Sequence, residues 1–201
     1  MFTGIIEEKG TIKQIKQVSK KSVQMTIGSS KVTEDVKVGN SISVNGICLT
    51  VTAFSDTWFQ VDVMPETIKA TSLKMLNEGS RVNLERSMPA EGRFGGHFVS
   101  GHVDGTGTII RKEPDENAIY YDIKIPDELA IYFITKGSVA VDGVSLTVFG
   151  ITGSTFTISL IPHTVSETIL GEKDAGDVVN IECDMLAKHV KNMLSQEHHE
   201  K

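Results

Sequence analysis

The stretch NGICLTV, residues 45–51, is repeated with small changes as DGVSLTV, residues 142–148. In both copies a polar residue and a glycine precede a short apolar run that ends in Leu-Thr-Val. Short apolar runs bounded by turn residues are typical of β-strands. The two copies lie 97 positions apart, and this offset determines how the rest of the chain is interpreted.

The same offset aligns the sequence along nearly its whole length. Residues 1–88 and 98–185, compared without a gap, share 20 identical positions. A period of this length is too long for a solenoid repeat and close to the size of one small domain. The sequence therefore predicts two like domains in tandem. The domains are an N-terminal barrel over 1–96, with a Gly- and Pro-containing linker at about 88–96, and a C-terminal barrel over 97–184. A helix and tail over 185–201 follow them.

Within each half the pattern is that of short β-strands. The runs SVQMTI, SISV, ICLTV and FQVDVM in the first half correspond to YYDIKI, SVAV, VSLTV and FTISLI in the second. Several short strands within about 90 residues favour a closed barrel, so the expected fold class is all-β with two tandem antiparallel barrels.

Helical signal is confined to three segments. ETIKATSLKML (66–76) and HTVSETIL (163–170) each follow a proline, whose fixed φ suits the start of a helix of about two turns. In DMLAKHVKNMLSQ (184–196), Asp184 can cap a helix on which apolar residues recur at helical spacing. This last helix is expected either to cover a core or to form an oligomer contact.

Composition excludes several classes of protein. A formal charge of −6 without a basic stripe argues against nucleic acid as a partner. No apolar run reaches the roughly 18 residues of a membrane span, and MFTGIIEEKG lacks the features of a secretory signal. Only two cysteines occur, which favours a reducing compartment over a disulfide framework. A cytoplasmic, globular protein is expected.

No metal site is predicted. The adjacent histidines of the tail QEHHEK (196–201) are expected to be solvated. His97, His102 and Asp104 have a spacing that spans a loop and a strand, and no cysteine cluster supports them as ligands.

The repeated strand offers a candidate ligand surface. Residues i and i+2 of a strand point the same way, so Cys48 and Thr50 share a face with Gly46, as Ser145 and Thr147 do with Gly143. A face of small and hydrogen-bonding groups suits a flat heterocycle, although the same residues can simply fill a core.

A second repeated phrase strengthens the ligand interpretation. VDVMPET (61–67) and ISLIPHT (158–164) each end a strand at a proline, where the hydrogen-bond ladder stops and backbone polar groups become available to a pteridine or pyrimidine. Gly4 and Gly101 open each half near its first strand. Three like-placed phrases in each half predict two like pockets.

The residues resemble the α-chain type riboflavin synthase family over nearly the whole chain. The matching phrases are MFTGIIE, NGICLTV, DVMPET, VNLERSM, GGHFVSGHVDG (95–105), KGSVAVDGVSLTV (136–148) and LIPHT (160–164). Phe94 and SET at 166–168 depart from the family pattern. The resemblance implies two six-stranded Greek-key barrels and a C-terminal helix, assembled as a homotrimer. Association with lumazine synthase is left open.

The resemblance also implies a transferase reaction without a cofactor. Two molecules of 6,7-dimethyl-8-ribityllumazine dismutate by transfer of a four-carbon unit, giving riboflavin and 5-amino-6-ribitylaminouracil. In the family the reacting pair lies between the N-terminal barrel of one subunit and the C-terminal barrel of its neighbour. Holding two identical molecules face to face would give the duplication a purpose.

Carried over from the family, the substrate-binding residues form two sets. The first pocket is expected to contain Gly4, Ile5, Ile6, Cys48, Leu49, Thr50, Asp62, Val63, Met64, Pro65, Glu66 and Thr67. The second is expected to contain Gly101, His102, Val103, Ser145, Leu146, Thr147, Ser159, Leu160, Ile161, Pro162, His163 and Thr164, with Lys136 reaching a ligand across the subunit contact.

The lumazine that donates the four-carbon unit and the lumazine that accepts it need different chemical treatment. Positions at which the two copies differ are therefore candidates for the catalytic residues. We expect Cys48 and Ser145 to lie beside C7 of their lumazines, where each either adds directly or holds an added water. Thr50 and Thr147 are the expected hydrogen-bond partners. His102 is the candidate for proton transfer, and the alternative is a turn residue that is hydrogen-bonded to the backbone. Asp184 is either catalytic or only a helix cap, and His97 is expected to be structural.

Two other functions compete with this interpretation. The double barrel also resembles lumazine and flavin antenna proteins of luminescent bacteria, which hold a chromophore without converting it and tend to have lost the second pocket. The C-terminal half here keeps the residues of that pocket. A structural or nucleic-acid-binding barrel is disfavoured by the acidic charge and by a content of one Trp and three Tyr.

Overall fold

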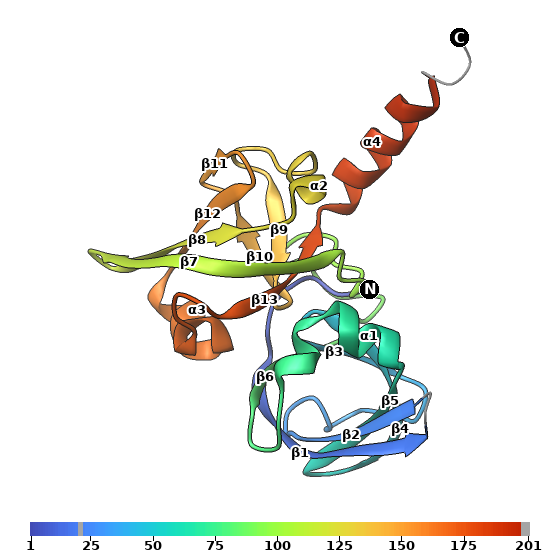
Figure 1. The fold of residues 1–201 in the computed structure, drawn as a ribbon. Coiled ribbons are helices and arrows are strands. Elements are labelled where there is room, and N and C mark those ends of the chain that lie inside the picture. The colour runs from blue at the N-terminus through green and yellow to red at the C-terminus, as the bar shows by residue number, and fades with distance from the viewer. Residues whose placement is uncertain (20–21, 198–201) are drawn as a thin grey trace.

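The fold is described from a computed structural model that covers residues 1–19 and 22–197, with side chains through residue 194. The His-containing end of the tail, 198–201, lies outside the described residues. Two β-rich bodies lie one against the other, and a C-terminal helix leads away from both (Figure 1). None of the described helices is long and apolar enough to cross a membrane.

The first half forms a closed antiparallel barrel. Its strands are β1 (Glu8–Ser19), β2 (Ser22–Gly28), β3 (Ser41–Val44), β4 (Ile47–Ser55), β5 (Trp58–Val63) and β6 (Arg81–Arg86). They pair in the order β1-β2-β5-β4-β3-β6, with β1 closing onto β6. The expected all-β barrel is therefore confirmed for this half.

The second half repeats this order with one strand divided in two. The strands are β7 (Gly105–Asp115), β8 (Ala118–Lys124), β9 (Ser138–Val141), β10 (Val144–Thr147), β11 (Gly150–Thr152), β12 (Thr155–Leu160) and β13 (Val178–Cys183), ordered β10-β9-β13-β7-β8-β12-β11. Together β10 and β11 cover 144–152, the positions that correspond to β4. The split falls where β4 itself has a register shift between Val51 and Ala53.

Short helices follow the prolines as expected. The helices α1 (Pro65–Ala70) and α3 (Pro162–Glu167) begin at the proline, and each leads into a 3-10 turn, η1 (Ser72–Met75) or η2 (Ile169–Glu172). Each α-helix has six residues, which agrees with the predicted length of about two turns, and each ends where Thr71 or Thr168 has an extended backbone. A further helical turn, α2 (Asp127–Ala130), was not predicted.

The two barrels meet across a joint with approximate twofold symmetry. Gly46 and Gly143 face each other so closely that a Cβ on either would lie 2.7–2.8 Å from the backbone nitrogen of the other. Buried amides extend the contact: Asn83 Nδ2 donates to the Asp142 carbonyl, and Asn180 Nδ2 donates to the Asn45 carbonyl. A backbone hydrogen bond from Phe2 to Val99 joins the start of each half. The two barrels are thus held together by contacts between equivalent positions of the repeat.

Asp142 breaks the symmetry of this joint, since the corresponding residue is Asn45. Its side chain is fully buried, 3.6 Å from the ammonium of Lys173. Burial raises the pKa of Asp142 from 3.8 to about 6, although the Lys173 charge and the N–H of Asn180 oppose the shift. The folded protein therefore binds this proton more tightly than the unfolded chain.

We expect the Asp142→Asn variant to remove a pH dependence of stability. A raised folded pKa gives stability that is fully present below pH 4 and lost as the pH rises through about 6. From pH 4 to 7 the wild type should lose up to about 3 kcal/mol of unfolding free energy relative to the variant. Urea unfolding at several pH values measures this difference, with Asp127→Asn as an exposed control. A difference that does not change with pH would contradict the assignment.

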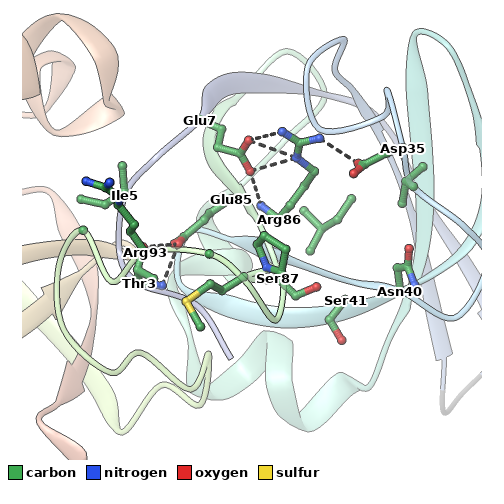
Figure 2. Close-up of a pocket in the computed structure, with 16 residues that line it drawn as sticks. Thr3, Ile5, Glu7, Asp35, Asn40, Ser41, Glu85, Arg86, Ser87 and Arg93 are labelled. Atoms are coloured by element: carbon green, nitrogen blue, oxygen red, sulfur yellow. Dashed lines mark hydrogen bonds and ion pairs between the residues drawn. The ribbon is translucent and has the colours of Figure 1, made fainter.

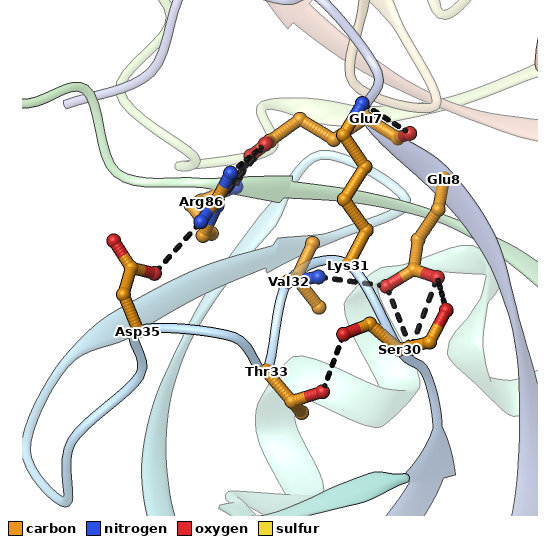
Figure 3. A network of polar contacts seen from close by, with 8 residues as sticks. All are labelled: Glu7, Glu8, Ser30, Lys31, Val32, Thr33, Asp35 and Arg86. Carbon is orange, nitrogen blue, oxygen red and sulfur yellow. Dashed lines mark hydrogen bonds and ion pairs between the residues drawn. The ribbon is translucent and has the colours of Figure 1, made fainter. Parts of the chain in front are cut away.

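Further polar contacts of the first barrel lie at the start of β1. The Glu8 carboxylate accepts hydrogen bonds from the backbone N–H groups of Ser30 and Val32, and Glu7 forms an ion pair with Arg86, which also contacts Asp35 (Figure 3). These contacts fix the loop after β2 against the barrel wall.

The C-terminal helix α4 (Met185–Glu197) begins where expected. The Asp184 carboxylate accepts a hydrogen bond of 2.9 Å from the N–H of Leu186, which confirms its capping role. Lys188 ties the base of the helix to Asp104 with contacts of 3.0 Å. Beyond that point, Figure 1 shows α4 projecting away from both barrels, and its apolar side chains are exposed: Leu186, Val190, Met193 and Leu194 are 54–68% accessible.

Candidate active site

The repeated strand presents alternate residues to the outside of each barrel. Leu49 and Val51 are buried in the first core, whereas Cys48 is half-buried and Thr50 is exposed. In the second half Ser145 is half-buried and Thr147 is exposed. The shared face that the sequence predicts is therefore an outer face of each barrel, covered by the joint at Gly46 and Gly143 and exposed at Thr50 and Thr147.

Each strand is completed by a segment from the other half. β4 pairs with β5 only from Val51 onward, and the Cys48 N–H donates instead to the Gly101 carbonyl at 2.8 Å. In the same way the Ser145 N–H donates to the Gly4 carbonyl at 2.8 Å. Val103 packs on the first core and Ile6 on the second.

This crossed arrangement corrects the predicted grouping of the pockets. Gly4 to Ile6 does not share a pocket with Cys48 to Thr50, because it lies beside Ser145. Gly101 to Val103 lies beside Cys48. The grouping was wrong because the first residues of each half cross the joint before entering their own barrel.

Glycine is required at both crossing points. Gly4 has φ +77°, and a Cβ there would lie 2.6 Å from the Cβ of Ser145. Gly101 has φ +82°, and a Cβ there would lie 2.5 Å from the Cβ of Cys48. Positive φ disfavours other residues, and the contact leaves no room for a side chain.

The proline phrases place further predicted residues where a strand passes into a short helix. Asp62, Met64 and Glu66 are exposed at the end of β5 and the start of α1, as Ile161 and His163 are at the start of α3. Val63 and Leu160 are buried and serve the cores. The sequence pattern implied that backbone polar groups are free at the prolines. The Met64 and Ile161 carbonyls are not free, because each accepts a hydrogen bond within its helix.

The side chain of Ser145 contacts His97, a residue expected from the sequence to have only a structural role. The Nδ1 atom of His97 lies 2.7 Å from Ser145 Oγ. Burial lowers the pKa of His97, and the nearby Asp184 charge partly opposes the shift. A neutral imidazole in contact with a serine hydroxyl can accept its proton. His97 lies just outside the aligned repeat, so comparing the two halves gave no signal for it.

The other titratable candidates lie in separate surroundings. His102 is exposed, and its backbone N–H donates to Ser100 Oγ at 3.2 Å. Lys136 has φ +68° at a turn where the first half has Gly39 with φ +91°. Its ammonium lies 4.5 Å from the centre of the Phe149 ring. Lysine at this position therefore occupies a strained backbone conformation that favours glycine.

A cavity of about 470 Å³ lies between the linker and the first barrel (Figure 2). Its walls include Ile5, Ser41, Glu85, Ser87 and Arg93. Burial opposes ionisation of Glu7, which forms one wall, but the hydrogen bonds and charge of Arg86, with the charge of Lys31, lower the pKa of Glu7 overall. Of the predicted substrate-binding residues only Ile5 lines this cavity. The Thr50 and Thr147 side chains, in contrast, are exposed.

Within the residues that the structure describes, no group of three or more His, Cys, Asp or Glu side chains is arranged to hold a metal ion. Asp104, considered above as a ligand, is bonded to Lys188 and to the Cys183 N–H. Both cysteines are free thiols.

Comparisons with known proteins agree with the duplication. The lumazine binding domain family matches twice, at residues 3–87 and 100–184. The chain is 61% identical over 96% of its length to a riboflavin synthase of Bacillus subtilis, and 60% identical over the same share to one of Bacillus amyloliquefaciens; each match covers 90% of the relative. A crystal structure of LumP complexed with 6,7-dimethyl-8-(1'-D-ribityl) lumazine superposes with a TM-score of 0.81 at 27% identity, covering 90% of this chain and 98% of that one.

The fold and the two crossed sites thus define a double-barrel protein with tandem lumazine-binding domains. The curated relatives extend over nearly the full chain at high identity. The chain belongs to the riboflavin synthase family.

Proposed function

We propose that this chain is a riboflavin synthase, a transferase that converts two molecules of 6,7-dimethyl-8-ribityllumazine into riboflavin and 5-amino-6-ribitylaminouracil without a cofactor. One observation carries the proposal: both halves keep a site of the same construction, with a glycine segment of one half beside the nucleophile strand of the other. A reaction between two identical molecules needs two such sites. Orientation of the pair can replace a bimolecular encounter.

The proposed protein roles follow the asymmetry of the two sites. Ser145, with His97 as its proton acceptor, activates or holds the group added at C7 of one lumazine. Cys48 occupies the same position for the other lumazine. Thr50 and Thr147 are hydrogen-bond partners, and exposed His102 transfers protons to or from a bound ligand. Asp184 acts through its charge on His97 as well as capping α4.

We also propose a homotrimer in which the N-terminal barrel of one subunit faces the C-terminal barrel of the next. The exposed apolar face of α4 supports this assembly, because four large side chains on one helix are rarely left to solvent. Lys136 then reaches a ligand across the subunit contact. Domain limits near residues 96 and 184, a cytoplasmic location and a possible association with lumazine synthase belong to the same proposal.

Replacing Ser145 or Cys48 with alanine, in separate variants, should lower kcat by about 10²-fold without changing the fold, because each removes one proton-transfer or nucleophilic contribution. Thr152→Ala, at the far end of the same split strand, is the control for loss of a hydroxyl. Steady-state turnover with the lumazine gives the comparison. Full activity in both folded variants would contradict the side-chain roles.

The proposed function is tested by incubating the purified protein with the ribityllumazine alone. We expect riboflavin to appear in the visible absorbance spectrum, with two lumazines consumed for each riboflavin formed. Tight binding of the lumazine without riboflavin would instead identify an antenna protein.

A further inference from the structure

Two buried carboxylates occupy equivalent positions on the last strand of each barrel. Glu85 on β6 is 4% exposed and Glu182 on β13 is 2% exposed. On the neighbouring strand Glu85 lies opposite Ser43, and Glu182 lies opposite Ala140. Burying a carboxylate costs free energy unless its oxygen atoms accept hydrogen bonds. The hydrogen-bond donors of Glu85 and Glu182 therefore identify the segments that these side chains fix in place.

The donors come from the segments that cross the joint. Glu85 accepts hydrogen bonds from the N–H groups of Thr3 at 2.7 Å and Gly4 at 3.1 Å, and from Thr3 Oγ1 at 3.1 Å. Glu182 accepts hydrogen bonds from the N–H and Oγ of Ser100, both at 2.6 Å, and from the Gly101 N–H at 2.9 Å. Burial raises the pKa of Glu85, while the N–H groups of Thr3 and Gly4 oppose the shift.

The same two segments also carry the carbonyls that accept hydrogen bonds from the strands of Ser145 and Cys48. Gly4, whose N–H is bound by Glu85, accepts the Ser145 N–H through its carbonyl at 2.8 Å. Gly101, whose N–H is bound by Glu182, accepts the Cys48 N–H at 2.8 Å. A single glycine residue thus links each carboxylate to the strand of the opposite barrel.

We infer that Glu85 and Glu182 are crossed positioning residues: Glu85, in the first barrel, sets the geometry of the Ser145 site of the second, and Glu182 sets that of the Cys48 site of the first. The inference rests on the proposed function and adds to it a physical link between the sites. We call each carboxylate, with the backbone N–H groups that it binds, a clamp: Glu85 with Thr3 and Gly4, and Glu182 with Ser100 and Gly101. Charge-assisted hydrogen bonds to backbone N–H groups are strong and directional, as a positioning contact requires.

The test uses Glu85→Gln and Glu182→Gln, which keep the shape of the side chain but turn an N–H₂ group toward one of the backbone donors. Glu8→Gln is the matched control, because Glu8 also binds backbone N–H groups but holds the loop at Ser30, away from both sites. In each clamp variant kcat should fall by about 10- to 10²-fold, as expected for a misplaced reacting group. Glu8→Gln should retain wild-type kcat.

Amide hydrogen exchange distinguishes positioning from general destabilisation. In Glu85→Gln the Ser145 amide should lose about 10-fold or more of its protection while the Cys48 amide keeps its own, and Glu182→Gln should show the reverse pattern. Equal loss at both amides, loss in the variant's own barrel, or unchanged protection would overturn the inference. If a glutamine variant does not fold, Thr3→Val removes the Oγ1 hydrogen bond to Glu85, and Ser100→Ala removes the Oγ hydrogen bond to Glu182 together with the contact from the His102 N–H. Each carries the same crossed expectation for amide exchange.

These outcomes separate the inference from the proposed function. If the wild type forms no riboflavin, the function fails, whereas the crossed exchange pattern still tests the clamps. If the wild type is active and the clamp variants match Glu8→Gln, only the clamps fail.

Discussion

Replacing Leu186 and Val190 together with glutamate is expected to yield monomers that lose turnover by more than about 10⁴-fold. Both side chains lie on the exposed apolar face of α4, at 63% and 56% accessibility. Charges there would oppose burial of that face between subunits. Because the reacting pair is proposed to span two subunits, a monomer would hold lumazines that never meet, and the advantage of orientation would be lost.

The matched control places the same charges on the other side of the helix. Lys191→Glu with Asn192→Glu should leave the trimer and its turnover intact. Analytical ultracentrifugation and steady-state kinetics on both double variants make the comparison. A monomeric Leu186→Glu/Val190→Glu protein with wild-type turnover would show that each chain completes its own reaction.

Gly101→Ala is expected to abolish the Cys48 site and to lower kcat by about 10³-fold. The new methyl group would lie 2.5 Å from the Cys48 Cβ and 2.9 Å from the Cys48 nitrogen, so the crossing segment has to move away from β4. Alanine at φ +82° adds about 1–2 kcal/mol of backbone strain. Calorimetry with riboflavin as the ligand should show one fewer site per chain.

Gly153→Ala separates the steric effect from the strain. Gly153 also has positive φ, at +58°, but a Cβ there would meet nothing within 4 Å. It should therefore share the loss of stability and keep both binding sites. Equal ligand stoichiometry in the two variants would contradict the role assigned to the crossing segment.

The duplication made most of the fold predictable from the sequence. The repeated strand, the prolines that start α1 and α3, and the cap at Asp184 are local signals, and the structure has all of them. The division of the strand at Phe149 was not predictable, because β10 and β11 together read as one continuous β pattern.

The site was less predictable, because its decisive contacts join residues far apart in the sequence. Gly4 meets Ser145 and Gly101 meets Cys48 only once the two barrels have docked. Aligning the halves pairs Gly4 with Gly101 but does not show which strand either one contacts. Glu85 and Glu182 were visible as an identical pair in the repeat, and their buried charge could have marked them.

A crystal structure with an unreactive lumazine analogue tests the central claim most directly. We predict two ligands per chain, one beside Cys48 with Gly101 and one beside Ser145 with Gly4, each facing a ligand held by a neighbouring subunit. A single ligand per chain, or two that are separated by protein from every neighbouring ligand, would contradict the account.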